Sequence, residues 1–74
     1  MKITLKLFAN FRLERFKIKE QEVSPATTCG EIVLSLGIPL AEIGVVLVNG
    51  RHAQLTQCLH EGDSLALFPL VGGG

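Results

Sequence analysis

Alternating apolar and polar residues at the start of the chain predict two strands. In residues 3–8 an aliphatic side chain falls at every second position, which is the periodicity of a strand with one buried face. A second alternation follows, in which we expect Phe16 and Ile18 to face the interior and Lys17 and Lys19 to face solvent. Two consecutive strands at the start of a chain favour an antiparallel hairpin.

A capping signature in the next segment predicts one helix. Thr28 stands three residues before Glu31, the spacing of a capping box in which each side chain satisfies a backbone amide of the other residue. Gly37 is placed to end the helix in a left-handed conformation, and Pro39 prevents its continuation. The helix is therefore short, about nine residues, and must be held by the packing of an apolar stripe. That stripe consists of Ile32, Val33 and Leu36.

Three further strands are predicted after the helix. The apolar run over residues 45–48 has the pattern of a buried strand, and Asn49-Gly50 after it favours a tight hairpin turn because both residues tolerate positive φ angles. Residues 51–54 then form a short polar strand suited to a sheet edge. The last strand covers residues 64–68, and Pro69 ends it because proline lacks an amide donor.

This order of elements predicts an α+β protein. A hairpin, a helix that crosses over it and a return of strands give a mixed sheet of four to five strands, covered on one face by one main helix. That is the β-grasp architecture of ubiquitin. We assign residues 1–69 to the β-grasp domain and residues 70–74 to a flexible C-terminal tail that ends in Gly-Gly.

Composition excludes several classes of function. The chain has 74 residues, of which 47% are hydrophobic, and this suits one small core. Seven basic and seven acidic residues give no net charge, so the basic footprint of a nucleic-acid binder is missing. No apolar run approaches the roughly 18 residues of a membrane span, and a strand at the very start leaves no room for a signal peptide. We therefore expect a cytoplasmic protein, monomeric when alone, that binds neither nucleic acid nor membrane.

The remaining reactive side chains form no catalytic or metal-binding pattern. Cys29 and Cys58 match neither a CxxC motif nor a zinc spacing. We expect two free thiols that behave as small buried or half-buried hydrophobes, with a disulfide between them as the less favoured alternative. A Cys29 thiol activated by the N-terminus of the helix is a minor alternative. His52 and His60 lack ligand partners at useful spacing, so we expect both on the surface and no metal site.

The end of the chain carries a recognisable motif. Residues 61–74 contain a Gly-Asp turn, an apolar strand, a Phe-Pro pair and a terminal Gly-Gly. With Leu7-Phe8-Ala9 and Val48-Asn49-Gly50 upstream, this pattern resembles the ubiquitin-like sulfur carrier family over essentially the whole chain. That family includes the small subunit of molybdopterin synthase and the sulfur carrier of thiamine biosynthesis. Phe68-Pro69-Leu70-Val71 is closer to the molybdopterin type, although Leu70 departs from its common Phe-Pro-Pro-Val, and the chain length is closer to the thiamine type.

The resemblance implies a carrier protein and not an enzyme. In such a carrier the carboxylate of Gly74 would be adenylated by a partner related to ubiquitin-activating enzymes, which uses ATP. A sulfur donor would then convert the adenylate to a thiocarboxylate, and the carrier itself would bind no cofactor. Its second partner would be the large subunit of molybdopterin synthase, or thiazole synthase in the thiamine pathway. A ubiquitin-like protein modifier joined through Gly74 to a lysine is the alternative of another class, and a plain interaction module is a further one.

Two sets of residues would carry this function. In the tail, Gly72 and Gly73 lead to Gly74 without any Cβ atom that would obstruct a narrow channel in a partner. On the body, alternation along the last strand places Phe68 on the face away from the helix, and alternation along the first strand places Phe8 on the same face. The expected partner-binding residues are Phe8, Leu47 (or Val45 in its place), Phe68, Pro69, Leu70 and Val71.

Overall fold

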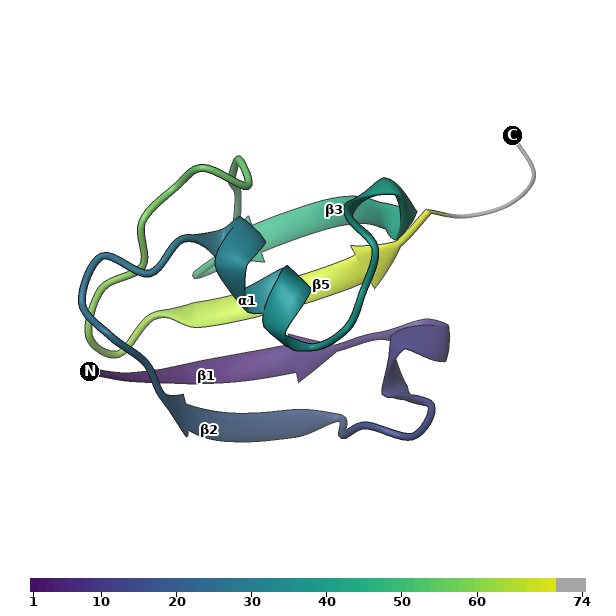
Figure 1. Ribbon diagram of the computed structural model, residues 1–74, viewed down its shortest axis with the longest axis horizontal. Helices are drawn as coiled ribbons and strands as arrows, with labels where there is room; N and C mark the ends of the chain where they lie inside the picture. The colour runs from purple at the N-terminus through teal and green to yellow at the C-terminus, as the bar shows by residue number, and fades with distance from the viewer. Residues whose placement is uncertain (71–74) are drawn as a thin grey trace.

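Within residues 1–70, which are the residues that the computed structural model describes, the chain forms one sheet with one α-helix packed across a face of it (Figure 1). The strands are β1 (Lys2–Leu7), β2 (Ile18–Glu22), β3 (Ile43–Val48), β4 (Arg51–His52) and β5 (Ser64–Pro69). The helices are α1 (Cys29–Ser35) and the 3-10 helices η1 (Ala9–Arg12) and η2 (Leu40–Glu42).

The last strand lies in the middle of the sheet. The spatial order is β2-β1-β5-β3-β4, in which β1 and β5 run parallel and all the other neighbours run antiparallel. The predicted fold class, an α+β β-grasp with a mixed sheet and one main helix, is confirmed, and the described residues form five strands. Strand β5 is paired on both sides, with β1 as far as Leu67 and with β3 as far as Pro69, where the chain leaves the sheet.

The helix α1 begins at the predicted capping box. The backbone amide of Glu31 donates to Thr28 Oγ1 at 3.2 Å, and the amide of Thr28 donates to Glu31 Oε1 at 2.9 Å. Two further amides of the first turn, those of Cys29 and Gly30, donate to carbonyl oxygens in the segment between β4 and β5. Gly37, with φ +76°, ends the helix as predicted. The helix has seven residues, so its stability depends on these partners and on packing.

The core lies between α1 and the sheet. Alternate side chains of β1, β3 and β5 point toward the helix and are buried, and each contributes about 1.5–3 kcal/mol to stability. No polar or charged residue of the described part is buried. The core consists of Ile3, Leu5, Leu7, Phe11, Cys29, Ile32, Val33, Ile38, Val46, Val48, Leu59, Leu65 and Leu67.

The predicted inward orientation holds for Phe16, but the orientations predicted for Ile18 and Lys19 are wrong. Ile18 pairs with Lys6, which places it on the face away from the helix, and its side chain is 58% exposed. Lys19 pairs with Leu5 and therefore points to the helix side of the sheet, although it too is exposed. Phe16 precedes the strand and packs against the edge of the core, with Lys19 Nζ 5.5 Å from its ring centroid. As an outer strand, β2 has water on both faces, so alternation does not identify its inner side.

The two turns at one end of the sheet are joined by a polar network. Asn49 and Gly50, with φ of +52° and +81°, form the predicted tight turn between β3 and β4. Asn49 Nδ2 donates to Asp63 Oδ1 at 2.9 Å, and the amide of Ser64 donates to Asn49 Oδ1 at 2.9 Å. Asp63 Oδ2 also accepts the backbone amide of His60 at 2.8 Å. Asp63 therefore holds the turn before β5, and its carboxylate has a structural role.

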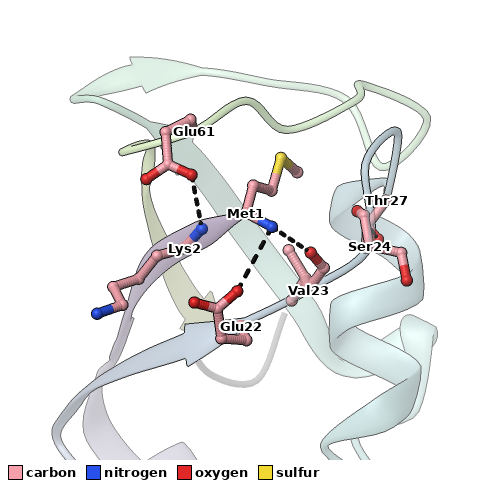
Figure 2. Close-up of polar contacts among 7 residues, drawn as sticks. All are labelled: Met1, Lys2, Glu22, Val23, Ser24, Thr27 and Glu61. Carbon is pink, nitrogen blue, oxygen red and sulfur yellow. Dashed lines mark hydrogen bonds and ion pairs between the residues drawn. The ribbon is translucent and has the colours of Figure 1, made fainter.

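Polar contacts also fix the start of the chain (Figure 2). The Met1 amino group donates to the Val23 carbonyl oxygen at 2.8 Å and lies 3.5 Å from Glu22 Oε2. The amide of Lys2 donates to Glu61 Oε1 at 2.9 Å, which joins β1 to the turn before β5. These contacts tie β1, β2 and the start of β5 together at one end of the sheet. Strand β5 finishes at the opposite end of the sheet.

Candidate partner-binding face and C-terminal exit

The face of the sheet away from α1 carries a group of half-buried apolar side chains. Phe68 of β5 pairs with Val45 of β3, and Leu47 lies two residues further along β3, opposite Ala66. Paired residues of neighbouring strands share a face, and the residues between them, such as Leu67, are buried on the helix side. We call Phe8, Val45, Leu47 and Phe68 the aromatic patch.

The centre of the aromatic patch is a pair of stacked rings. The ring centroids of Phe8 and Phe68 lie 4.2 Å apart, and the ring planes differ by 12°. Phe8 follows directly after β1, and its amide donates to the Leu67 carbonyl oxygen at 3.2 Å, which continues the parallel pairing of β1 and β5. Both rings remain only partly buried. The stack therefore leaves apolar ring surface accessible on this face without being part of the core.

A basic side chain that sequence reasoning did not select covers one side of this stack. The guanidinium carbon of Arg12 lies 5.3 Å from the Phe8 ring centroid, within cation–π range. Arg12 Nε also donates to the Leu7 carbonyl oxygen at 2.7 Å, which fixes the direction of the guanidinium group. The sequence places Arg12 four residues after Phe8, but this spacing brings the two side chains together only because residues 9–12 form the 3-10 helix η1.

The chain leaves the sheet beside the aromatic patch. Strand β5 ends at Pro69, which pairs with Ile43, and the next amide, that of Leu70, donates to the Glu42 carbonyl oxygen at 2.9 Å. The side chain of Leu70 is 64% exposed. Phe68 is thus two residues before the exposed Leu70, so the aromatic patch and the exit of the chain are adjacent.

The family of the chain is decided by a match over nearly its whole length. The family model described as Mut7-C ubiquitin matches residues 2–72. The chain belongs to the Mut7-C ubiquitin family. The predicted resemblance to ubiquitin-like proteins of the sulfur-carrier type is thereby confirmed at the level of the family. No curated protein matches this member of the Mut7-C ubiquitin family.

Several solved structures share the fold of this Mut7-C ubiquitin protein. Small archaeal modifier protein 1 (SAMP1) of Haloferax volcanii has a TM-score of 0.78 and 29% identity, with 100% of each chain covered. Molybdopterin converting factor subunit 1 of Pyrococcus furiosus has a TM-score of 0.77 and 22% identity, over 96% of this chain and 99% of that one. A protein–protein complex of subunits 1 and 2 of the molybdopterin-converting factor of Helicobacter pylori 26695 matches with a TM-score of 0.66 and 18% identity, with 100% of each chain covered.

The structure brings together part of the predicted partner-binding set of the Mut7-C ubiquitin protein. Phe8, Leu47 and Phe68 share the outer face, and Pro69 and Leu70 lie at the exit of the chain. Val71, Gly72, Gly73 and Gly74 lie outside the described residues. The role of all these residues in binding stays a prediction.

The two cysteines lie in different environments. Cys29 is buried in the core, and burial raises the pKa of its thiol, an effect that outweighs the lowering by its backbone hydrogen bond. The alternative of a helix-activated Cys29 is therefore wrong. Cys58 is exposed, contrary to the prediction of a buried or half-buried side chain, because its segment pairs with Thr28 only through an isolated bridge at the surface. Both cysteines are free.

Other polar side chains gather at the end of the sheet opposite the exit. A hollow of about 510 Å³ there contains His52 and His60, both exposed as predicted. Its lining residues are Val48, Asn49, Arg51, His52, Gln57, His60 and Asp63. Over residues 1–70 no three His, Cys, Asp or Glu side chains come close enough to hold a metal ion, and no helix is long and apolar enough to span a bilayer.

Proposed function

We propose that this chain is a sulfur carrier in the biosynthesis of molybdopterin, the organic part of the molybdenum and tungsten cofactor. The carboxylate of Gly74 would be the group that is activated and that carries sulfur. The observation that supports this most strongly is the exit of the chain at Leu70 directly beside the stacked Phe8 and Phe68. A partner can bind the patch and receive the terminus in one contact.

The proposed chemistry takes place in two steps at the terminal carbonyl carbon. A carboxylate oxygen of Gly74 attacks the α-phosphorus of ATP, so that pyrophosphate leaves and an acyl-adenylate forms. A hydrosulfide-equivalent donor then attacks the carbonyl carbon; a C–S bond forms, the C–O bond to AMP breaks, and AMP leaves. The product is a thiocarboxylate, which is a nucleophilic sulfur that does not diffuse away. The acids, bases and Mg²⁺ for both steps belong to the activating enzyme.

The small body and the glycine tail suit a terminus that must enter more than one active site. Five extended residues, 70–74, span roughly 17 Å, so the reacting carboxylate can reach a buried site while the sheet stays outside. Gly73 and Gly74 have no Cβ atom and can pass close to the backbone of a partner. The partners would be a ubiquitin-activating-type adenylyltransferase, a sulfur donor and the large subunit of molybdopterin synthase. The fold shared with subunit 1 in the H. pylori complex of subunits 1 and 2 supports the last of these.

The aromatic patch has the composition of a binding surface. Aromatic residues are enriched in the central parts of protein interfaces, where they anchor the partner in desolvated pockets. Arg12 adds a positive charge at the rim, and Lys6, which pairs with Ala66 on the same face, adds a second. An activating partner would therefore present an apolar pocket with acidic residues around it.

A second candidate function is favoured by one of the structural neighbours. SAMP1, which is 29% identical, is named as a modifier protein. In that function the same acyl-adenylate would form, but the acceptor would be the ε-amine of a lysine on another protein, and an isopeptide bond would replace the thiocarboxylate. A carrier for thiamine biosynthesis, with thiazole synthase as the partner, would differ from the first proposal only in its second partner.

The activation step can be tested by ATP–pyrophosphate exchange. The chain, the adenylating enzyme encoded by the same genome, Mg-ATP and labelled pyrophosphate should give labelled ATP only when the chain is present. Deletion of residues 72–74 should abolish the exchange, because it removes the whole glycine tail and moves the terminal carboxylate back by roughly 10 Å. The unfolding midpoint should stay the same, because the strands of the described residues end at Pro69. Exchange that is unchanged in the deletion variant would show that the terminus is not the activated group and would refute the proposal.

A further inference from the structure

The strand next to the exit contains a glycine that the backbone of the exit itself requires. In the pairing of β3 with β5, Ile43 lies opposite Pro69 and Val45 opposite Phe68, so Gly44 is the extra residue of a bulge. A Cβ atom at Gly44 would lie 2.6 Å from the Pro69 carbonyl oxygen, 2.9 Å from the Pro69 carbonyl carbon and 2.9 Å from the Leu70 nitrogen. Gly44 does not have a positive φ, so space and not backbone conformation demands glycine here.

A carbonyl oxygen just before β3 accepts the amide of the first residue after β5. Pro69 has no amide hydrogen, so the first donor at the exit is the amide of Leu70, which donates to the Glu42 carbonyl oxygen at 2.9 Å. Glu42 is the last residue of η2, and its own amide donates to the Pro39 carbonyl oxygen at 2.9 Å. The Leu70 amide is therefore bonded to a residue that is itself held by the hydrogen-bonded turn of η2.

We propose that Gly44 is a positioning residue for the C-terminal carboxylate. Its missing side chain lets the backbone of Pro69 and Leu70 pass against β3, and the bond from Leu70 to Glu42 then holds Leu70, the residue from which the tail starts, in a fixed place at the exit. The inference rests on the proposed function of the terminus, but the geometry at Leu70 is independent of it. The three atoms nearest to a Cβ atom at position 44 all belong to the backbone of Pro69 and Leu70, and none belongs to the core. The exit of the chain is therefore the feature that requires glycine here.

The size of the effect follows from the close contacts. Ordinary contacts of a Cβ atom begin at 3.4 Å, so an alanine at position 44 must push the Pro69 carbonyl oxygen away by about 0.8 Å, the difference between 3.4 and 2.6 Å. These three contacts are backbone atoms of Pro69 and Leu70 and cannot rotate aside, so the movement separates Leu70 from Glu42. A partner must then order at least one additional residue of the tail, which corresponds to about a tenfold loss of affinity.

The test compares Gly44→Ala with Gly50→Ala in two measurements. Gly50, in the turn at the other end of β3, has a φ of +81° and open space around it, so alanine there strains the fold without touching the exit. The first measurement is steady-state adenylation, with the chain as the varied substrate. The second is amide hydrogen exchange of Leu70 followed by NMR.

For Gly44→Ala we expect a KM about tenfold higher with unchanged kcat, and loss of the exchange protection that the Leu70 amide shows in the wild-type chain. Gly50→Ala should keep both the wild-type KM and the protected Leu70 amide at a comparable loss of stability. An unchanged KM in Gly44→Ala, or the same rise in both variants, would overturn the inference.

If Gly44→Ala does not fold, the wild-type chain decides: a protected Leu70 amide supports the inference, and exchange at the rate of an unstructured peptide overturns it. If the wild-type chain is not adenylated at all, the proposed function fails, and the exchange measurement still tests the geometry.

Discussion

Replacement of Phe68 by alanine tests whether its ring belongs to a binding surface or to the core. Phe68 is half-buried, and its main partner is the Phe8 ring at 4.2 Å. The stacked pair contributes about 0.5–1.5 kcal/mol beyond area burial, and a fully buried Phe→Ala change costs about 3–5 kcal/mol. For a half-buried ring we therefore expect Phe68→Ala to lower the free energy of unfolding by about 1–2 kcal/mol. As an anchor, the same ring should contribute about 2 kcal/mol or more to binding, which is a loss of about 30-fold in affinity.

The assay measures both quantities on the same variant. The chain contains neither Trp nor Tyr, so unfolding in urea is best followed by far-UV circular dichroism, and binding to the adenylating partner by calorimetry. Ile38→Val is the matched control, because Ile38 is 2% exposed in the core and its truncation costs about 0.5–1.5 kcal/mol. The control should lose similar stability and keep its affinity. A Phe68→Ala variant that loses more than about 3 kcal/mol of stability and binds normally would show that the ring belongs to the core.

Two further predictions concern the body of the protein. Thr28→Ala removes the acceptor of the Glu31 amide and should lower the free energy of unfolding by about 1 kcal/mol, measured in urea; an unchanged midpoint would mean that the capping box does not stabilise the helix. A thiol reagent at neutral pH should label Cys58 and leave Cys29 unmodified until the protein is unfolded, because Cys29 is buried and its thiol pKa is raised. Equal labelling of both thiols in the native protein, read by peptide mass, would contradict this.

Local signals in the sequence predict most of the fold. The capping box of Thr28 and Glu31 and the positive φ angles of Asn49 and Gly50 depend only on neighbouring residues, and both are present in the structure. The central strands β1 and β5 also follow their apolar alternation, because one face of each is fully covered. The outer strand β2 does not, since its side chains are exposed on both faces and Ile18 points away from the core.

The candidate site was predicted only in part, because it is made by strands that are distant in the sequence. Alternation places Phe8 and Phe68 on one face, but their stacking requires the parallel pairing of β1 with β5. Arg12 reaches the Phe8 ring only because η1 turns the chain back after β1. The glycine at position 44 within an apolar strand was a visible signal of a bulge, yet its contact with Pro69 depends on the register of β3 and β5.

The central claim is that the carboxylate of Gly74 carries sulfur, and the mass of the intact chain tests it most directly. After incubation with the adenylating enzyme, Mg-ATP and a sulfide donor, the mass should rise by the difference between one sulfur and one oxygen atom. The gain should be located in the C-terminal peptide and should be absent when ATP is omitted. A chain that keeps its mass in the presence of a fully active adenylating enzyme, or that gains mass only through an isopeptide bond to a lysine of another protein, would contradict the sulfur-carrier account.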